Sequence, residues 1–261
     1  MIDILISTSN DRIIALADLR PLDNVHYVIV HQVFPDFVLS HNALEASQLL
    51  EQREDISYLK VIEKGLSKSR NRAIKASRNK YALIADDDIQ FNYSGIFEMV
   101  ERMSKESIQV ASGRHQFFSG QMAKSYKSES FILNKISAAS VSSVDMVLDV
   151  KAIREHDVFF DERFGLGTEL PSGEEYIFIN DALKAGLRVK YYPITLAYHP
   201  DEVSGHDFFS TPNKTIAKRE MFVRCFPKSH YIYRLLFWVK KLPIVIKNRS
   251  LLRFTRNILW R

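Results

Sequence analysis

Short apolar runs alternate with helix-like segments along the first 200 residues of the chain. Runs rich in β-branched and aromatic residues predict strands at residues 2–7, 25–33, 57–63, 81–85, 108–113, 144–150 and 187–192. We expect Pro193 to end the last of these strands. Apolar positions at helical spacing predict helices at residues 66–79, 93–105 and 173–185. Strands that alternate with helices predict an α/β fold with a mostly parallel central sheet and helices on both faces.

The composition is that of an ordinary globular protein, with 261 residues, 46% of them hydrophobic and 26% charged. It excludes collagen-like and disordered chains. A single cysteine, Cys225, excludes a disulfide framework and a multi-cysteine metal site. The first residues lack the basic and apolar regions of a secretory signal, so we expect a cytoplasmic protein.

Charge divides the chain into two parts. Residues 214–261 contain 13 lysines and arginines and one glutamate, a net charge of +12. The first 213 residues contain 23 basic and 30 acidic side chains, a net charge of −7. We therefore expect a catalytic domain at residues 1–212 and a basic C-terminal helical region at residues 213–261, whose charge favours an anionic partner.

Residues 230–261 interleave apolar and basic side chains. Charged residues and Pro243 interrupt the apolar stretches before they reach the roughly 20 residues that a bilayer span requires. Basic side chains together with Trp238, Phe254 and Trp260 favour an amphipathic helix on an anionic membrane, on the inner face of the cytoplasmic membrane. The alternative is a helix packed on the catalytic domain. We expect no nucleic-acid partner, because no recognised module for one accompanies the charge.

Three consecutive aspartates, Asp86, Asp87 and Asp88, follow the apolar run YALIA. Adjacent carboxylates repel each other, and their position at the end of a buried strand is costly unless a cation lies nearby. Ligands of such sheets bind at the carboxyl ends of the strands. This position therefore favours a site for Mg²⁺ or Mn²⁺ over a solvated acidic turn.

Three further segments carry polar side chains suited to a site. The segment GLSKSRNRA, residues 65–73, places backbone amides and basic side chains at a helix start capped by Ser67, which suits an anion such as a diphosphate. Ser172 and Glu175 fit a capping box, so Glu175 is either a cap or a general base beside Glu174. His199 follows the last predicted strand and suits a metal site shared with Asp88, with His206 as the alternative.

The order of these segments resembles a known family. A first strand ends in Ser and Thr, and GLSKSRNRAI, a strand with DDD, FDERFG, SGEE at a helix start and a late histidine follow. Over roughly residues 1–200 this order is similar to the inverting nucleotide-sugar glycosyltransferases of family 2, which have the GT-A fold. The resemblance implies a metal-dependent enzyme that transfers a sugar from a nucleotide-diphosphate sugar, taken here as a UDP-sugar.

The resemblance also implies roles for individual residues. The donor nucleotide is expected to contact Ser7, Thr8, Ser9, Arg70, Asn71, Asp86 and Asp87, with Gln32 or Asp36 as helpers. A divalent metal, Mn²⁺ or Mg²⁺, is expected on Asp88, Asp86 and His199, and Asp87 can exchange roles with either neighbour because three aspartates leave the register open. Glu175 is expected to be the general base, with Glu174 as the alternative.

The acceptor implied by the resemblance is a hydroxyl of a bacterial surface polysaccharide or of a lipid-linked oligosaccharide. Two other functions remain open from the sequence. Clustered aspartates also hold the two metals of nucleotidyl and phosphoryl transferases. A catalytically inactive protein that binds a membrane or a nucleic acid through its basic region is the third possibility.

Overall fold

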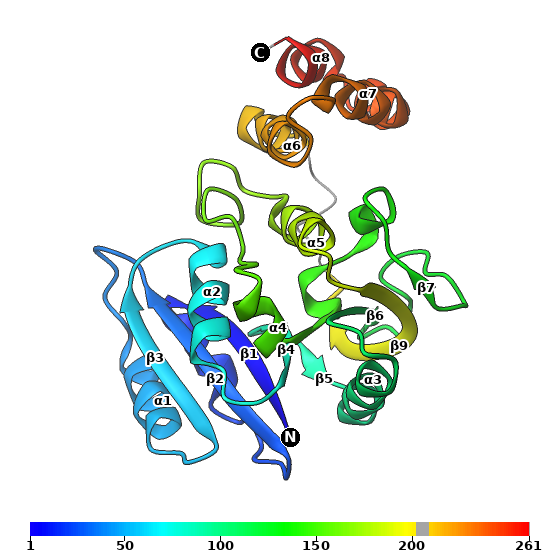
Figure 1. The fold of residues 1–261 in the computed structure, drawn as a ribbon. Coiled ribbons are helices and arrows are strands. Elements are labelled where there is room, and N and C mark those ends of the chain that lie inside the picture. Colours follow the sequence, from blue (N-terminus) through cyan, green and yellow to red (C-terminus); the bar gives the residue numbers. More distant parts are fainter. Residues whose placement is uncertain (202–208, 261) are drawn as a thin grey trace.

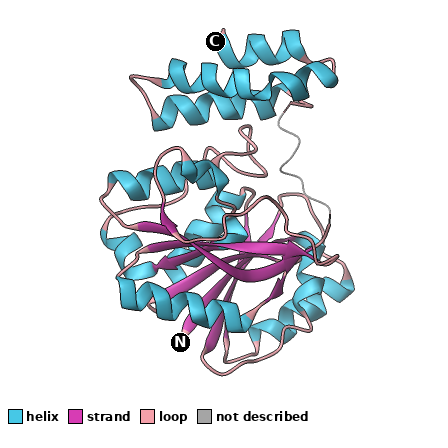
Figure 2. Ribbon diagram, turned by 90° about the vertical axis from the view of Figure 1, so that its right-hand side faces the viewer, coloured by secondary structure: helices cyan, strands magenta, loops and turns pink. Residues whose placement is uncertain are grey.

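The computed structural model describes residues 1–201 and 209–260. His206 lies outside them. Within the described residues, a nine-stranded sheet runs through the body of the molecule in the order β3-β2-β1-β4-β8-β6-β9-β5, and β7 pairs with β9 (Figure 1). Helices cover both faces of this sheet, and three C-terminal helices form a further layer at one end (Figure 2).

The first half of the sheet is parallel. It consists of β1 (Ile2–Ser9), β2 (Val25–Val33), β3 (Ile56–Ile62) and β4 (Tyr81–Asp86). The 3₁₀ helix η1 (Asn10–Leu16) follows β1, and α1 (His41–Glu51) and α2 (Leu66–Ala76) connect the next strands. Ser7 of β1 lies directly beside Asp86 of β4 in the ladder. The parallel arrangement therefore brings the polar ends of these two strands together.

The second half of the sheet is mixed. β8 (Met146–Asp149) is antiparallel to both β4 and β6 (Val110–Phe117), whereas β9 (Val189–His199) is parallel to β6. The short strands β5 (Gln90–Phe91) and β7 (Phe131–Ile132) are antiparallel to β9. The remaining elements of this half are α3 (Tyr93–Glu106), η2 (Ser137–Ser140), η3 (Ser143–Asp145), α4 (Val150–Glu155) and α5 (Glu174–Lys184).

Each face of the sheet has its own core. One core packs β-strand side chains such as Leu5 and Ile84 against α2, α4 and α5, and the other packs Ile4 and Ile6 against η1, α1 and α3. Successive residues of a strand point to opposite faces, which explains why neighbouring residues of β1 belong to different cores. The predicted α/β fold with helices on both faces is confirmed.

The C-terminal helices are α6 (Pro212–Cys225), α7 (His230–Lys247) and α8 (Leu251–Leu259). Met221, Phe222 and Cys225 of α6 are buried in the same core as α5. α8 packs on α7 through a small cluster around Val245, Phe254 and Ile258. The predicted boundary at residue 212 coincides with the start of α6, but this helix shares the core of the first part of the chain.

Two local predictions are wrong for physical reasons. β9 continues through Pro193, because its register against β6 shifts between Ser112 and Arg114, and a bulge of this kind tolerates a residue without an N–H group. Ser67 is not the cap of α2, because Gly65 at φ +132° occupies that position and the Ser67 hydroxyl donates instead to the Phe164 carbonyl oxygen at 2.6 Å.

The predicted capping box at α5 is also wrong. Gly173, at φ +107°, is the residue before the first turn, and its carbonyl oxygen accepts from the Ile177 backbone N–H at 3.0 Å. Ser172 therefore lies outside the helix. Glu174 and Glu175 occupy the first turn, where carboxylates interact favourably with the helix dipole.

Candidate active site

Polar side chains from four elements meet at the carboxyl end of the parallel half of the sheet. The ends of β1 and β4 supply Thr8 and the three aspartates. The second turn of α2 supplies Arg70, and the first turn of α5 supplies the two glutamates. Hydrogen bonds and ion pairs connect these side chains across separations of up to 104 positions in the sequence. The structure thus brings together residues that the sequence singled out in separate motifs.

The three aspartates have different surroundings. Asp87 is buried, accepts a hydrogen bond from the Thr8 hydroxyl at 2.6 Å, and binds the guanidinium of Arg12 through Nε at 2.9 and 3.0 Å. Arg12 Nη2 also donates to Asp88 Oδ2 at 3.0 Å. These hydrogen bonds raise the pKa of Arg12. Asp87 is thereby occupied by protein groups, which leaves Asp86 and Asp88 as the members of the triad that face the site.

Asp88 and His199 together fit a divalent cation. Asp88 Oδ1 is buried and has no hydrogen-bond partner among the residues that the structure describes, and His199 Nε2 lies 3.8 Å from it. His199 Nδ1 lies 2.8 Å from the Pro200 carbonyl oxygen, which can only accept a hydrogen bond, so Nδ1 is the donor and Nε2 is the nitrogen on the side of Asp88. Within the described residues no group of three or more His, Cys, Asp or Glu side chains is arranged around one metal position. Substrate phosphates and water would have to supply the other ligands, as Mg²⁺ and Mn²⁺ sites permit.

Arg70 is the central cation of the site. Its side chain is 2% exposed and lies 3.3 Å from Asp86, 3.4 Å from Glu174 and 3.6 Å from Glu175. Its guanidinium also lies over the Phe160 ring at 5.5 Å. Although burial opposes the charge, the three carboxylates raise the pKa of Arg70. One guanidinium therefore holds three carboxylates close together.

Burial and neighbouring charges change the proton affinity of two carboxylates of the site, Glu174 and Asp86. Burial and the neighbouring charge of Glu175 raise the pKa of Glu174 to about 7. Burial likewise raises the pKa of Asp86 against the attraction of Arg70. Within residues 1–201 and 209–260, Glu174 Oε2 is buried without a hydrogen-bond partner, whereas the side chain of Glu175 is 23% exposed. Glu175 is thus the member of the pair that a substrate can reach.

Two other residues that were predicted to bind the donor nucleotide, Ser7 and Asn71, are buried. Ser7 is buried and accepts a hydrogen bond from the Ser69 hydroxyl at 2.8 Å. Asn71 is buried and binds the Phe160 backbone through both ends of its amide, at 2.9 and 2.8 Å, which fastens the following loop to α2. Ser9 precedes η1 and makes no side-chain cap there. Of the helpers, Gln32 donates to the Gly65 carbonyl oxygen, and Asp36 is exposed in a turn.

Sequence reasoning missed two groups near the site. Arg12 gave only a weak signal, its position shortly after the polar end of the first strand. His115 gave none: its Nδ1 lies 2.8 Å from the buried Asp145, and its ring is 5.9 Å from the ring of His199. Asp145 also pairs with Lys124 at 3.2 Å. This buried network supports the strand ends that carry His199.

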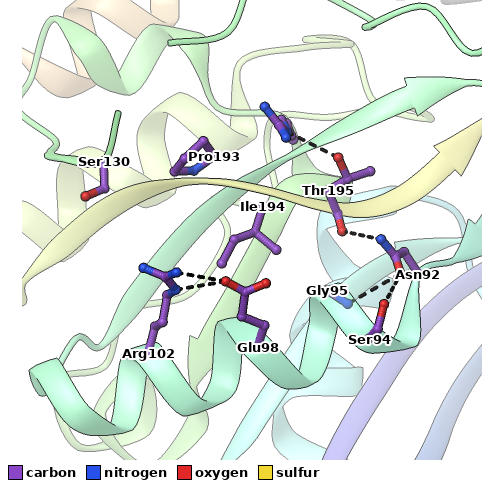
Figure 3. A pocket seen from close by; sticks show the side chains of 10 residues that line it. Asn92, Ser94, Gly95, Glu98, Arg102, Ser130, Pro193, Ile194 and Thr195 are labelled. Atoms are coloured by element: carbon purple, nitrogen blue, oxygen red, sulfur yellow. Dashed lines mark hydrogen bonds and ion pairs between the residues drawn. The ribbon is translucent and has the colours of Figure 1, made fainter. Parts of the chain in front are cut away.

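A pocket of about 380 Å³ lies on the side of α3 (Figure 3). Glu98 and Arg102 of α3 pair with each other at its edge, and Thr195 of β9 binds Asn92 and Arg114. The pocket shares no residue with the predicted site. Its polar groups bind one another, so the carboxylate cluster remains the candidate active site.

Comparisons with known proteins agree with this arrangement. Residues 41–155 match the model of glycosyl transferase family 2. The fold is similar to the crystal structure of S. aureus TarS residues 1–349 in complex with UDP-GlcNAc, with a TM-score of 0.64, 15% identity, and coverage of 85% of this chain and 66% of that one. For the complex of the same fragment with UDP the TM-score is 0.61, with 16% identity and coverage of 85% and 64%. No curated protein sequence matches significantly.

The fold and the site define the class first. A mixed α/β sheet with helices on both faces is the GT-A fold, which this chain shares with the TarS fragments. The match to the model of glycosyl transferase family 2 extends over residues 41–155 and leaves the rest of the chain outside it. The chain spans 64% and 66% of the length of the TarS fragments to which it is similar.

Proposed function

We propose that the protein is an inverting glycosyltransferase that transfers a sugar from a UDP-sugar to a hydroxyl of a saccharide or lipid-linked acceptor, with a divalent metal bound at Asp88. The observation that carries this proposal is the pairing of an orphaned Asp88 oxygen with His199 on one side of the site and the glutamate pair at Arg70 on the other. The binding of UDP-GlcNAc by the similar TarS fragment supports the choice of donor.

The charge of the site supports a metal as partner of the diphosphate. Asp86, Asp88 and Glu175 make the open part of the site acidic. Arg70 is already shared among Asp86, Glu174 and Glu175. A diphosphate entering such a site is repelled unless a cation accompanies it. Asp88 and His199 would hold Mn²⁺ or Mg²⁺, which supplies charge stabilisation to the leaving diphosphate when bound.

The protein groups would then divide the remaining work. Asp86, fixed by Arg70, is placed to position the donor next to the metal. Glu175, the more exposed member of the glutamate pair, would take the proton from the acceptor hydroxyl as that oxygen attacks the anomeric carbon. The bond from that carbon to the diphosphate breaks as the new bond forms on the opposite face, so one displacement inverts the configuration.

The exposed face of α7 supports a membrane as the place of the reaction. Tyr231, Ile232, Leu235, Leu236 and Val239 recur at helical spacing and are 46–62% exposed. The opposite side of α7 packs inward through Phe237 and Val245. Such an uncovered apolar stripe with basic neighbours is typical of a helix at the surface of an anionic bilayer.

The positive charge of the C-terminal helices is complementary to an anionic membrane. The only acidic residue from 214 to 261 is Glu220, while Lys240, Lys247, Arg249, Arg253 and Arg256 are exposed on α7, α8 and the turn between them. No helix in the described part of the chain is long and apolar enough to cross a bilayer. We therefore propose that the helical layer lies on an anionic membrane, where a lipid-linked acceptor would be available.

Thermal unfolding with nucleotides tests the donor site directly. The melting temperature is measured with UDP, GDP, CDP or TDP, each with Mn²⁺ or with EDTA, for the wild type, Asp88→Asn and the control Asp18→Asn, which changes an exposed carboxylate away from the site. We expect UDP to raise the melting temperature only with Mn²⁺, because ligand binding to the folded state stabilises it. The shift should be lost in Asp88→Asn and kept in the control.

Other outcomes would change the conclusion. Stabilisation by a different nucleotide would show that the donor carries another base and would still support a nucleotide-sugar transferase. Equal stabilisation with EDTA would remove the metal from the mechanism. The absence of a shift with every nucleotide would contradict the proposed transferase.

A further inference from the structure

The pocket beside α3 is a second place in the molecule with the size and lining of a binding site. It encloses about 380 Å³ between the first three turns of α3 on one side and residues 193–195 of β9 with Arg114 of β6 on the other (Figure 3). Thr195 precedes His199 by four residues, which is roughly 13 Å along a strand. The pocket is therefore separate from the candidate active site.

An irregular pairing of β6 with β9 accounts for the position of Arg114. The register between the two strands shifts on both sides of Arg114, which lies opposite Thr195. A Cβ atom at Gly113 would lie 2.7 Å from the Ile194 carbonyl oxygen, so the two strands approach closely just before Arg114. Bulges of this kind change the direction of a side chain relative to regular alternation. A cation from an internal strand thereby comes to line the pocket.

The guanidinium of Arg114 is only partly used by other protein groups. Its Nε donates to the Thr195 hydroxyl oxygen at 3.2 Å. Across the two described ranges, 1–201 and 209–260, its two Nη groups make no hydrogen bond and no ion pair. The side chain is half-buried. Because a cation that is partly removed from water is costly without a counter-charge, this side of the pocket favours an anionic group.

The α3 side of the pocket offers hydrogen-bond acceptors instead. Arg102 contacts Glu98 only through Oε1, from Nε at 3.0 Å and from Nη2 at 2.9 Å, which leaves Oε2 outside the pair. The Ser94 hydroxyl donates to Asn92 Oδ1 at 2.8 Å, so its oxygen can still accept. Glu98 disfavours a bare inorganic anion. A molecule with an anionic group at one end and hydroxyl donors at the other matches both sides.

We propose that this pocket binds a small anionic sugar, with its carboxylate or phosphate on Arg114 and its hydroxyl groups on Ser94 and Glu98. The Thr195 hydroxyl accepts from Arg114 and can donate its own hydrogen to the same anionic group. The volume lies in the range of small-molecule sites. The inference goes beyond the proposed function, because the pocket shares no residue with the carboxylate cluster and requires neither metal nor nucleotide.

Calorimetric titration tests the chemistry of the ligand. The probes are glucuronate, glucose 6-phosphate, glucose and inorganic phosphate, each with EDTA so that no metal bridges the probe to the carboxylate cluster. At least one of the two anionic sugars should bind about tenfold or more tightly than both glucose and inorganic phosphate, and the tighter of the two identifies the anionic group. Equal binding of inorganic phosphate and glucose 6-phosphate, or no binding of either anionic sugar, would overturn the proposal.

Substitutions test the place of binding. Arg114→Met should weaken the anionic sugar about tenfold or more, because it removes the charge-assisted hydrogen bonds. Ser94→Glu should do the same by repulsion, and a carboxylate in the first turn of α3 is compatible with the helix dipole, so the fold is kept. The control Arg78→Met changes an exposed arginine that does not line the pocket and should bind as wild type does. Binding that survives both pocket variants would overturn the assignment.

UDP stabilisation with Mn²⁺ separates this inference from the proposed function. Arg114→Met should lose the sugar and keep the shift in melting temperature that UDP produces. Sugar binding in a wild type that no nucleotide stabilises would contradict the proposed function alone. If Arg114→Met lost both ligands, the result for Ser94→Glu would decide the proposal.

Discussion

Buried carboxylates in this protein are held in two different ways. Asp3 is fully buried and accepts hydrogen bonds from the Arg78 and Asn79 backbone at 2.6 and 2.9 Å, and from the Ser77 and Asn79 side chains. Glu174 is also buried, and one of its carboxylate oxygens has no hydrogen-bond partner in the described part of the chain. The pKa of Asp3 is lowered, because these hydrogen bonds outweigh burial, whereas the pKa of Glu174 is raised to about 7. The first arrangement stabilises the ionised carboxylate, whereas the second leaves a buried carboxylate whose proton affinity is raised.

Replacement of Asp3 should therefore cost stability in a pH-dependent way. Because its folded pKa lies below the ordinary value of 3.8, its contribution is present above about pH 4 and is lost as the pH falls through the folded pKa. At pH 7 we expect Asp3→Asn to lower the free energy of unfolding by about 2 kcal/mol. Denaturant titrations between about pH 7 and pH 2.5 should show the difference from wild type shrinking with acid. A difference that is constant with pH would show that the charge of Asp3 is not the cause.

At the scale of elements, the irregular strand β9 sets how α3 sits on the sheet. The bulge around Pro193 brings the Thr195 carbonyl oxygen against the first turn of α3, where it accepts from Asn92 Nδ2 at 2.9 Å. A Cβ atom at Gly95 would lie 2.1 Å from that carbonyl oxygen. The contact joins two backbones, so neither partner can move aside without disturbing its element. Gly95 is therefore required by close packing.

Gly95→Ala tests this contact against helix propensity. Alanine favours a helix by about 1 kcal/mol over glycine. The clash with backbone should more than reverse that gain and destabilise the protein by about 1–3 kcal/mol in denaturant unfolding. Ser104→Ala, at an exposed position of the same helix, should be neutral or slightly stabilising. A Gly95→Ala protein as stable as wild type would mean that β9 and α3 adjust freely.

At the scale of the whole molecule, the C-terminal helices have two different surfaces. α6 closes the core of the catalytic part through Met221 and Phe222, and α7 presents its apolar stripe away from that core. α8 covers part of α7 and adds exposed arginines. A layer that is anchored on one side and apolar and basic on the other can hold the active site at a fixed distance from a membrane.

Vesicle sedimentation checks this arrangement. Wild type should bind vesicles that contain phosphatidylglycerol more strongly than pure phosphatidylcholine, and salt should weaken the binding. Leu236 and Leu49 are similarly exposed, at 62% and 59%, but Leu49 lies on α1. Leu236→Asp should reduce binding at least about tenfold. The substitution removes an apolar side chain that would insert into the membrane, and it adds a negative charge that the anionic lipids repel. Equal loss in Leu49→Asp, or none in Leu236→Asp, would contradict the membrane face.

The sequence by itself determined the alternation of strands and helices, the aspartate cluster at a strand end and the basic C-terminal region. These follow from local patterns, because burial on both faces of a sheet requires continuous apolar runs and a strand end is marked by polar residues. The residues of the motifs, among them Thr8 and Glu175, could therefore be predicted from the sequence. The roles that the family resemblance implies for them stay proposals.

Only the tertiary structure decided which of these residues contact one another, how far each is buried and how strongly each binds a proton. Arg12 reaches Asp87 across 75 positions and Arg70 reaches Glu174 across 104, and no local pattern carries such pairings. Neither α2 nor α5 starts at the serine that capping propensity favours: Ser67 donates to the Phe164 carbonyl oxygen, and Gly173, which lies against Met221, precedes α5. Burial, which depends on the whole fold, separates the buried Glu174 from the partly exposed Glu175. Local sequence specifies elements, whereas proton affinity and contact depend on what the rest of the chain places around each group.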